Sequence, residues 1–196
     1  MLLYQDIIKD DNPILRNKSE DVTLPLSDED IATIEKINEY LVNGYDKEKV
    51  EKFGIRPAYG LAAPQIGVFK KIFVILATDE TGKTHHYGVI NPKIISHSEE
   101  KVYLPGGEGC LSVDRNVDGF VHRHKRVKAK VWLYDFIEKT VREEILKLEN
   151  LMAIIFQHEY DHLFGILFYD HIDKNNPFFI QNNSTGLTFI TNDEEK

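Results

Sequence analysis

The stretch Gln157-His158-Glu159-Tyr160-Asp161-His162-Leu163-Phe164-Gly165 decides the fold, because it places two histidines four residues apart with a glutamate directly after the first. On an α-helix, residues i and i+4 lie on one face with their Cβ atoms roughly 5–6 Å apart, so both imidazoles can reach one metal ion. The helical pitch turns Glu159 about 100° away from His158. Its carboxylate can therefore reach a water molecule beside the ion without binding the ion, as a general base does.

The preceding residues predict that this stretch continues a helix that starts near Glu149 and stops at Gly165. Apolar residues and the two histidines follow one another at spacings of three and four: Leu151, Ile154, Ile155, His158 and His162. Two histidines at this spacing are usually a surface pair or satisfied core residues. Here they extend a buried stripe and carry the inserted glutamate, so we interpret them as metal ligands.

A catalytic site of this type has three protein ligands and an open fourth position. In one class of metalloprotease the third ligand is a histidine, but that position is Phe168. In another class it is a later glutamate, and none occurs between Tyr160 and Asp193. The single cysteine, Cys110, is a candidate because a thiolate binds such ions strongly. Taken alone, it could equally be a small buried hydrophobic residue.

A third stretch, Gly60-Leu61-Ala62-Ala63-Pro64-Gln65-Ile66-Gly67, surrounds one amide side chain with small residues. Such residues suit a wall where backbone approaches a ligand and Gln65 donates a hydrogen bond, although the stretch alone could be a tight turn before a strand. The three segments G-L-A-A-P-Q, E-G-C-L-S and Q-H-E-x-D-H, in this order, resemble the signature motifs of the peptide deformylase family. The resemblance extends from about residue 12 to about residue 177.

This resemblance implies a hydrolase that removes the N-formyl group from the N-terminal formylmethionine of newly made polypeptides and releases formate. It implies one divalent ion, with Fe²⁺ favoured and Zn²⁺, Ni²⁺ or Co²⁺ possible in purified protein. The ligands would be Cys110, His158 and His162. Glu159 would act as general base and then acid, while the Gln65 side chain and the Leu111 N–H would stabilise the oxyanion.

The resemblance also implies where the substrate binds. The residues expected to contact it are Gly60 through its main chain, Gly109, Tyr59 at the edge, and Leu151, Ile154 and Ile155 around the methionine side chain. Glu108 and Asp161 are two candidates for orienting the histidines. Residues 45–57, which are charged and expected to be irregular, resemble an insertion of the Gram-positive type of the family. Ala58-Tyr59 departs from the Gly-Val or Gly-Ile that usually precedes this glycine.

Two other functions stay open at this level. A metalloprotease lacks its usual third ligand in this sequence. A structural metal-binding module normally has four protein ligands, and with one cysteine the fourth would have to be His171.

Composition limits the partners. With 196 residues, 42% of them hydrophobic, and a net charge of −8, we expect one catalytic domain over residues 1–196, loose from about 186 to 196, and no direct nucleic-acid binding. We also expect a monomer, although the sequence itself does not determine the oligomeric state. Charged residues among the first ten and a single cysteine predict a cytoplasmic protein without a signal peptide. The longest apolar runs are six residues, too short for a membrane span. The expected partners are formyl-Met peptides and nascent chains, with action at the ribosome left open.

The expected fold class is α+β, with antiparallel strands surrounding one central helix that carries the metal motif. An N-terminal helix should follow the cap Ser27 and end at Gly44. Strands are expected over residues 72–77, 87–95 (broken early by Pro92), 127–133, 140–148 and 166–169. The basic run 122–130 alternates with apolar residues, so we interpret it as a strand with one solvated face and not as a nucleic-acid patch.

Overall fold

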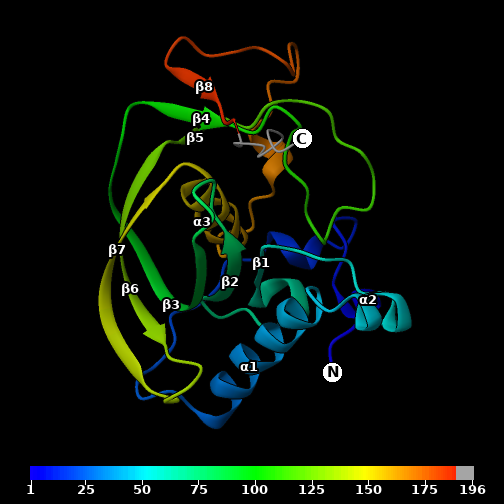
Figure 1. Cartoon of the computed structure of the whole chain (residues 1–196), viewed down its shortest axis with the longest axis vertical. Coiled ribbons are helices and arrows are strands. Elements are labelled where there is room, and N and C mark those ends of the chain that lie inside the picture. Colours follow the sequence, from blue (N-terminus) through cyan, green and yellow to red (C-terminus); the bar gives the residue numbers. More distant parts are fainter. Residues whose placement is uncertain (189–196) are drawn as a thin grey trace, which may run out of the picture.

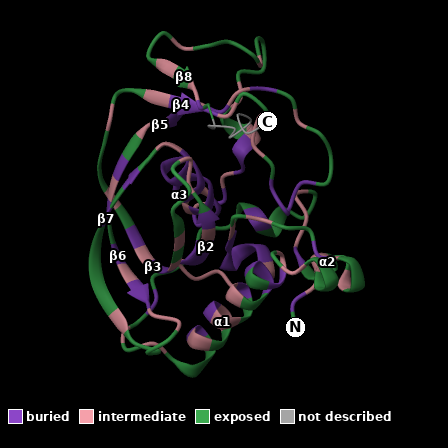
Figure 2. Ribbon diagram, viewed as in Figure 1, coloured by how far each residue is buried: buried purple, intermediate pink, exposed green. Residues whose placement is uncertain are grey.

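Helix α3 (Asn150–His162) lies at the centre of the fold, with strands around it (Figure 1). The computed structural model describes residues 1–188. Every residue of α3 from Leu151 to Glu159 is buried, as is His162, and Figure 2 shows the contrast with the mostly exposed strand β7 (Val141–Glu149). The expected α+β class, with the histidine motif on a central helix, is confirmed.

A five-stranded antiparallel sheet separates α3 from the N-terminal helix α1 (Asp28–Asn43). Its order is β1 (Gly60–Ala62), β2 (Ile72–Thr78), β3 (Thr84–His97), β6 (Arg126–Tyr134) and β7. Phe73 packs edge-on against Phe156 of α3 at 5.3 Å between ring centroids, whereas Val74 packs on the α1 side. Because both faces of β2 are covered, its sequence is a continuous apolar run.

A smaller sheet also packs against α3 and contains β5 (Arg123–His124), β4 (Lys101–Tyr103) and β8 (Ser184–Gly186). β4 pairs with β5 antiparallel and with β8 in parallel; the sequence did not predict the parallel pair. The sequence also predicted a loose end from about residue 186. Within the described part, Leu187 is buried and its N–H donates to Tyr103 O at 2.8 Å; residues 189–196 lie outside the described residues.

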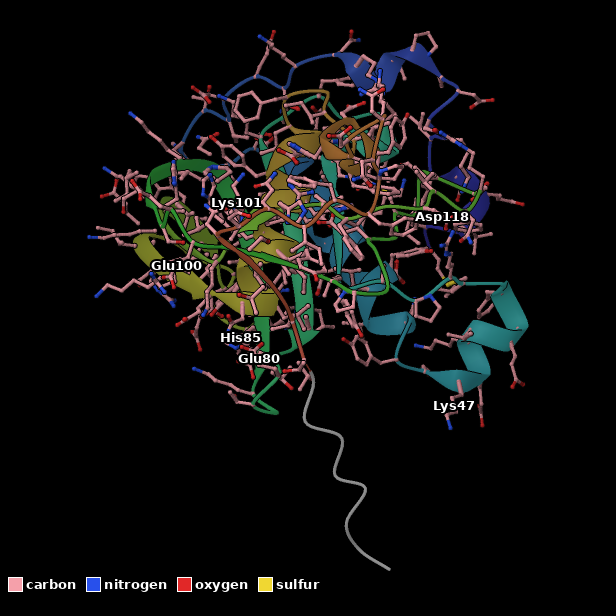
Figure 3. All side chains as sticks on the ribbon, turned by 90° about the horizontal axis from the view of Figure 1, so that it is seen from above. Lys47, Glu80, His85, Glu100, Lys101 and Asp118 are labelled. Atoms are coloured by element: carbon pink, nitrogen blue, oxygen red, sulfur yellow. The ribbon has the colours of Figure 1, made fainter. Side chains whose placement is uncertain are left out.

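The helix expected after Ser27 is confirmed as α1, but the segment expected to be irregular contains a second helix, α2 (Lys47–Phe53). The Asp46 side chain accepts from Lys49 N, and Gly54 ends the helix with φ +62°, a conformation that favours glycine. Figure 3 shows Lys47 at the edge of the molecule. With no buried residue, α2 lacks the apolar periodicity by which a helix is predicted.

Two expected strands also differ. β3 does not break at Pro92, because Asn91 takes φ +47° and a register shift between Ile90 and Lys93 removes the proline from the hydrogen-bond ladder. Residues 166–169 do not form a strand. The second half of this segment belongs to the 3₁₀ helix η4 (Phe168–His171). The N–H of Leu167, just before the helix, donates to Asp170 Oδ2 at 2.8 Å and stabilises its start.

Three further 3₁₀ helices, η1 (Tyr4–Asp6), η2 (Pro13–Arg16) and η3 (Ala63–Ile66), complete the described elements. η3 follows β1 directly and carries Gln65, so the first motif turns back towards α3 immediately after its strand. Within residues 1–188, no helix is long and apolar enough to cross a membrane.

Candidate active site

The structure brings together the three expected metal ligands, although Cys110 is far from the histidines in sequence. Ligand atoms of Cys110, His158 and His162 all lie within 4.8 Å of one another, and among residues 1–188 they are the only group of this kind. Cys110 Sγ is 3.4 Å from His162 Nε2. The histidines come from successive turns of α3, and Cys110 from the loop between β4 and β5.

Glu108, and not Asp161, contacts a ligand histidine. His158 Nδ1 donates to Glu108 Oε2 at 2.8 Å, which leaves His158 Nε2 to face the other donors. Burial would raise the pKa of Glu108, but Arg123 and His158 outweigh it and lower the pKa to about 2. The carboxylate therefore stays ionised and holds one tautomer of the ring.

Arg123 connects the two candidate carboxylates. Its guanidinium is 4% exposed and donates to both oxygens of Glu108 at 2.8 and 2.9 Å. It also donates to Asp161, which in turn accepts from His171 Nε2 at 2.7 Å. A buried guanidinium is tolerated here because two carboxylates neutralise it.

Glu159 lies against strand β1 with an unused oxygen. Its side chain is buried, and Oε2 has no hydrogen-bond partner among the residues that the structure describes. Burial raises the pKa of Glu159 to about 7. Such a carboxyl group can exchange a proton near neutral pH.

Gln65 points its amide group into the same region. Its Oε1 accepts from Ala62 N at 2.9 Å, which fixes the orientation of the amide. Its Nε2 donates to Ser112 Oγ at 3.0 Å and lies 3.5 Å from Cys110 Sγ. The donor group of the amide therefore lies beside the proposed ligand set.

These groups open onto a cavity of about 560 Å³. Its lining contains all of the predicted substrate and catalytic residues and two of the three predicted metal ligands: Tyr59, Gly60, Gln65, Gly109, Cys110, Leu111, Leu151, Ile154, Ile155, His158 and Glu159. Segments 56–60 and 107–111 line the cavity together with residues of α3.

The donor set fits a divalent ion. Burial would raise the pKa of the Cys110 thiol, but His162 and His158 outweigh it and hold that pKa well below its ordinary value. One thiolate and two imidazoles could hold a metal ion, and within residues 1–188 the buried Glu159 Oε2 beside them has no hydrogen-bond partner. Phe168, which replaces the third histidine of one protease class, stacks on His158 with ring centroids 6.1 Å apart.

The sequence analysis did not identify Arg123 or Ser112. Arg123 belongs to the run that we interpreted as a strand with one solvated face. Every second residue of this run faces the core, as Val127 and Ala129 do, and Arg123 lies on the same buried side. A charged residue on the buried phase of an alternating strand was therefore the available signal. Ser112 lies in the E-G-C-L-S segment, yet nothing local indicated that its hydroxyl would meet Gln65.

An α+β protein with a Cys-His-His cluster and an adjacent buried glutamate belongs to the class of metal-dependent hydrolases. The family model of polypeptide deformylase matches residues 4–178. Peptide deformylase 2 of Bacillus cereus is 49% identical over 188 residues, covering 95% of this chain and 99% of the relative. Peptide deformylase of Staphylococcus epidermidis is 47% identical over 178 residues, covering 90% and 94%.

Solved structures agree. A probable peptide deformylase from Synechococcus phage S-SSM7 aligns with a TM-score of 0.62 at 33% identity, over 85% of this chain and 98% of that one. Peptide deformylase from Ehrlichia chaffeensis aligns with a TM-score of 0.67 at 28% identity, over 87% and 89%. The chain belongs to the peptide deformylase family, which is metal-dependent, and it is an enzyme of that family.

Proposed function

We propose that this cavity removes the N-formyl group from the formylmethionine that begins a new polypeptide and releases formate. The observation that carries the proposal is the buried Glu159 Oε2, which has no partner within residues 1–188 and lies beside a Cys-His-His donor set at an apolar cavity. Membership of the deformylase family supports the same reaction. A metalloprotease or a structural metal module would not account for that membership.

Cys110, His158 and His162 would hold one divalent ion, and we propose Fe²⁺, with Zn²⁺, Ni²⁺ or Co²⁺ as substitutes. When bound, the ion would supply the Lewis acidity that makes a water molecule acidic near neutral pH. Glu108 keeps the proton of His158 on Nδ1, and Arg123 keeps Glu108 ionised and in place.

Glu159 performs the proton transfers. Its Oε2 accepts a proton from the attacking water and passes it to the amine nitrogen of methionine as the bond to the formyl carbon breaks. Because burial disfavours the charged form, the carboxyl group can hold that proton between the two steps.

Gln65 and Leu111 stabilise the oxygen of the formyl group as it becomes negative. Gln65 Nε2, whose amide group is positioned by its bond to Ser112, donates to this oxygen, and so does the main-chain N–H of Leu111 in the lining of the cavity. A donor of this kind contributes roughly 3–4 kcal/mol to the transition state.

The main chain of β1 binds the peptide. β1 is an edge strand. Gly60 lies opposite Ile75, and Leu76 N donates to Tyr59 O, so the N–H and C=O of Gly60 point to the free edge. The methionine side chain then packs on Leu151, Ile154 and Ile155, with Gly109 across the groove.

We further propose that residues 1–196 act as one catalytic domain, in the cytoplasm and as a monomer, on nascent chains that emerge from the ribosome. Contacts of α3 with strands of both sheets support the single domain. A lone cysteine suits a reducing compartment.

The test compares formate release from formyl-Met-Ala-Ser with acetate release from acetyl-Met-Ala-Ser by the metal-loaded protein. We expect turnover of the formyl peptide alone. Glu159→Gln should keep the bound metal near stoichiometric and lose nearly all turnover, whereas Cys110→Ala should lose the metal as well. Equal cleavage of the acetyl peptide would overturn the proposed reaction, and loss of metal from Glu159→Gln would show that Glu159 is a ligand.

A further inference from the structure

Two tyrosines form the outer rim of the substrate cavity. Tyr45 and Tyr59 both line it, and each side chain is 56% exposed. Both are tied to Leu76: the Tyr45 hydroxyl donates to Leu76 O at 2.9 Å, and Leu76 N donates to Tyr59 O at 2.9 Å. The first bond holds the Tyr45 ring, and the second holds the main chain of Tyr59 at the rim, so both aromatic side chains start from fixed positions beside the cavity.

Alternation along β1 determines which face of the sheet this surface occupies. A Cβ at Gly60 would point at Glu159, and Ala62 packs in the α3 cluster. Leu61 packs in the α1 cluster. Tyr59 directly precedes β1, and its main-chain bond to Leu76 continues the pairing of β1 with β2 by one residue. Successive side chains of a strand point to opposite faces, so Tyr59 shares the face of Leu61, away from α3.

A peptide bound along the free edge of β1 alternates in the same way. If the methionine side chain enters the apolar pocket on α3, the side chain of the second residue points to the opposite face. That face carries Tyr59, and side chains of neighbouring strands on one face lie roughly 4.5–5.5 Å apart at Cβ. The residue after formylmethionine therefore meets the tyrosine rim.

We propose that Tyr59, whose main chain is held by Leu76, selects formylmethionyl chains whose second residue is aromatic. This inference rests on the proposed function, because it requires the substrate to bind along β1. Aromatic pairs gain stabilisation beyond the area that they bury, so the preference for phenylalanine over alanine at the second residue should be about 3- to 10-fold.

The experiment measures kcat/KM for formyl-Met-Phe-Ser and formyl-Met-Ala-Ser with the metal-loaded full chain, and the quantity of interest is their ratio. We expect a ratio of about 3–10 in the unmodified protein, near 1 in Tyr59→Val, and close to the original value in Tyr59→Phe. Phe179→Val removes an exposed aromatic ring outside the cavity and should leave the ratio unchanged.

A ratio near 1 in the unmodified protein overturns the inference, and this result does not depend on the folding of any variant. Retention of the full ratio by Tyr59→Val overturns it equally. Absence of formate release from both peptides contradicts the proposed function instead, so the two failures are distinguishable.

Discussion

Gly60 lets the side chain of Glu159, the proposed general base, lie against strand β1. A Cβ at this position would lie 2.5 Å from Glu159 Oε1 and 2.8 Å from its Cδ and Cγ. The Glu159 side chain is buried, so it has little room to withdraw. A residue with a side chain at position 60 would therefore push Glu159 away from β1, where the peptide is proposed to bind.

We predict that Gly60→Ala lowers kcat by about 10²-fold, because a displacement of the base by roughly 1 Å is enough for a loss of that size. Metal content should not change, since no ligand is displaced. Gly106→Ala is the matched control, as a Cβ there meets nothing within 4 Å. A normal kcat in Gly60→Ala would show that Glu159 can relocate without consequence.

Gln65 should act only in the transition state. We predict that Gln65→Ala lowers kcat by about 10²–10³-fold with little change in KM. Ser112→Ala keeps the amide but removes the hydroxyl that it contacts at 3.0 Å, so a smaller loss in kcat is expected. Steady-state kinetics on formyl-Met-Ala-Ser measure both, and a raised KM with intact kcat in Gln65→Ala would identify Gln65 as a ground-state binding residue.

Among individual residues, the sequence predicted that Cys110, His158 and His162 would come together, because short motifs carry them. It did not decide between Glu108 and Asp161, since both flank ligand residues in sequence. Only the fold turns Glu108 towards His158 and Asp161 towards His171. Arg123 was missed because the ion pairs that compensate its burial come from other segments.

Helix α1 supports the sheet from the side opposite the site, and its first turn contains a buried carboxylate. Asp30 accepts from Ser27 Oγ at 2.7 Å and from Lys70 Nζ at 2.5 Å. Burial would raise the pKa of Asp30, but the bonds from Lys70 and Ser27 outweigh it and lower that pKa. The charged carboxylate therefore stabilises the folded state.

The sign of the pH dependence follows from this lowered pKa. The contribution of Asp30 is fully present above its unfolded pKa of about 3.9 and is lost as the pH falls through the folded pKa. We predict that Asp30→Asn lowers the free energy of unfolding by about 1 kcal/mol at neutral pH. The difference should vanish in strong acid.

Denaturant unfolding at a series of pH values measures this difference. Glu29→Gln makes the same change of charge on an exposed neighbour and should alter stability by less than about 0.5 kcal/mol. A difference between Asp30→Asn and the unmodified protein that persisted unchanged into strong acid would show that the effect is packing and not charge.

Elements with a strong apolar period were predictable, and those held by other contacts were not. α1, β2 and α3 are buried along a face or entirely, so their sequences carry the pattern. β8 consists of Ser184–Gly186 and depends on pairing with β4, which no local pattern reveals. η4 replaces an expected strand because Asp170 binds the Leu167 N–H and Arg16.

For the molecule as a whole, a bound ion would join parts of the chain that otherwise meet through side-chain packing. Cys110 comes from the loop between the strands β4 and β5 of the small sheet, and the two histidines come from the central helix. An ion that binds only the folded arrangement stabilises it by mass action, by about 4 kcal/mol at a thousand times the dissociation constant. For a chain of this size that corresponds to about 10 °C in Tm.

We predict that removal of the metal by a chelator lowers Tm by about 10 °C, and that reloading with either Fe²⁺ or Zn²⁺ under argon restores it. Activity should separate the two ions. The iron form should turn over formyl-Met-Ala-Ser faster and lose activity in air, because Fe²⁺ beside a thiolate is open to oxidation. The zinc form should be slower and stable, and zinc should displace iron in aerobic solution because its affinity is higher.

Cys110→Ala is the control for the site, because it removes one of the three ligands. In this variant the chelator should change Tm by no more than about 2 °C, since little specific binding to the folded state remains. The same large change in Cys110→Ala would mean that the stabilising ion binds elsewhere. Thermal stability reports where the ion binds, whereas turnover reports which ion the reaction uses. Equal turnover by the zinc and iron forms would therefore refute the choice of iron but not the three proposed ligands.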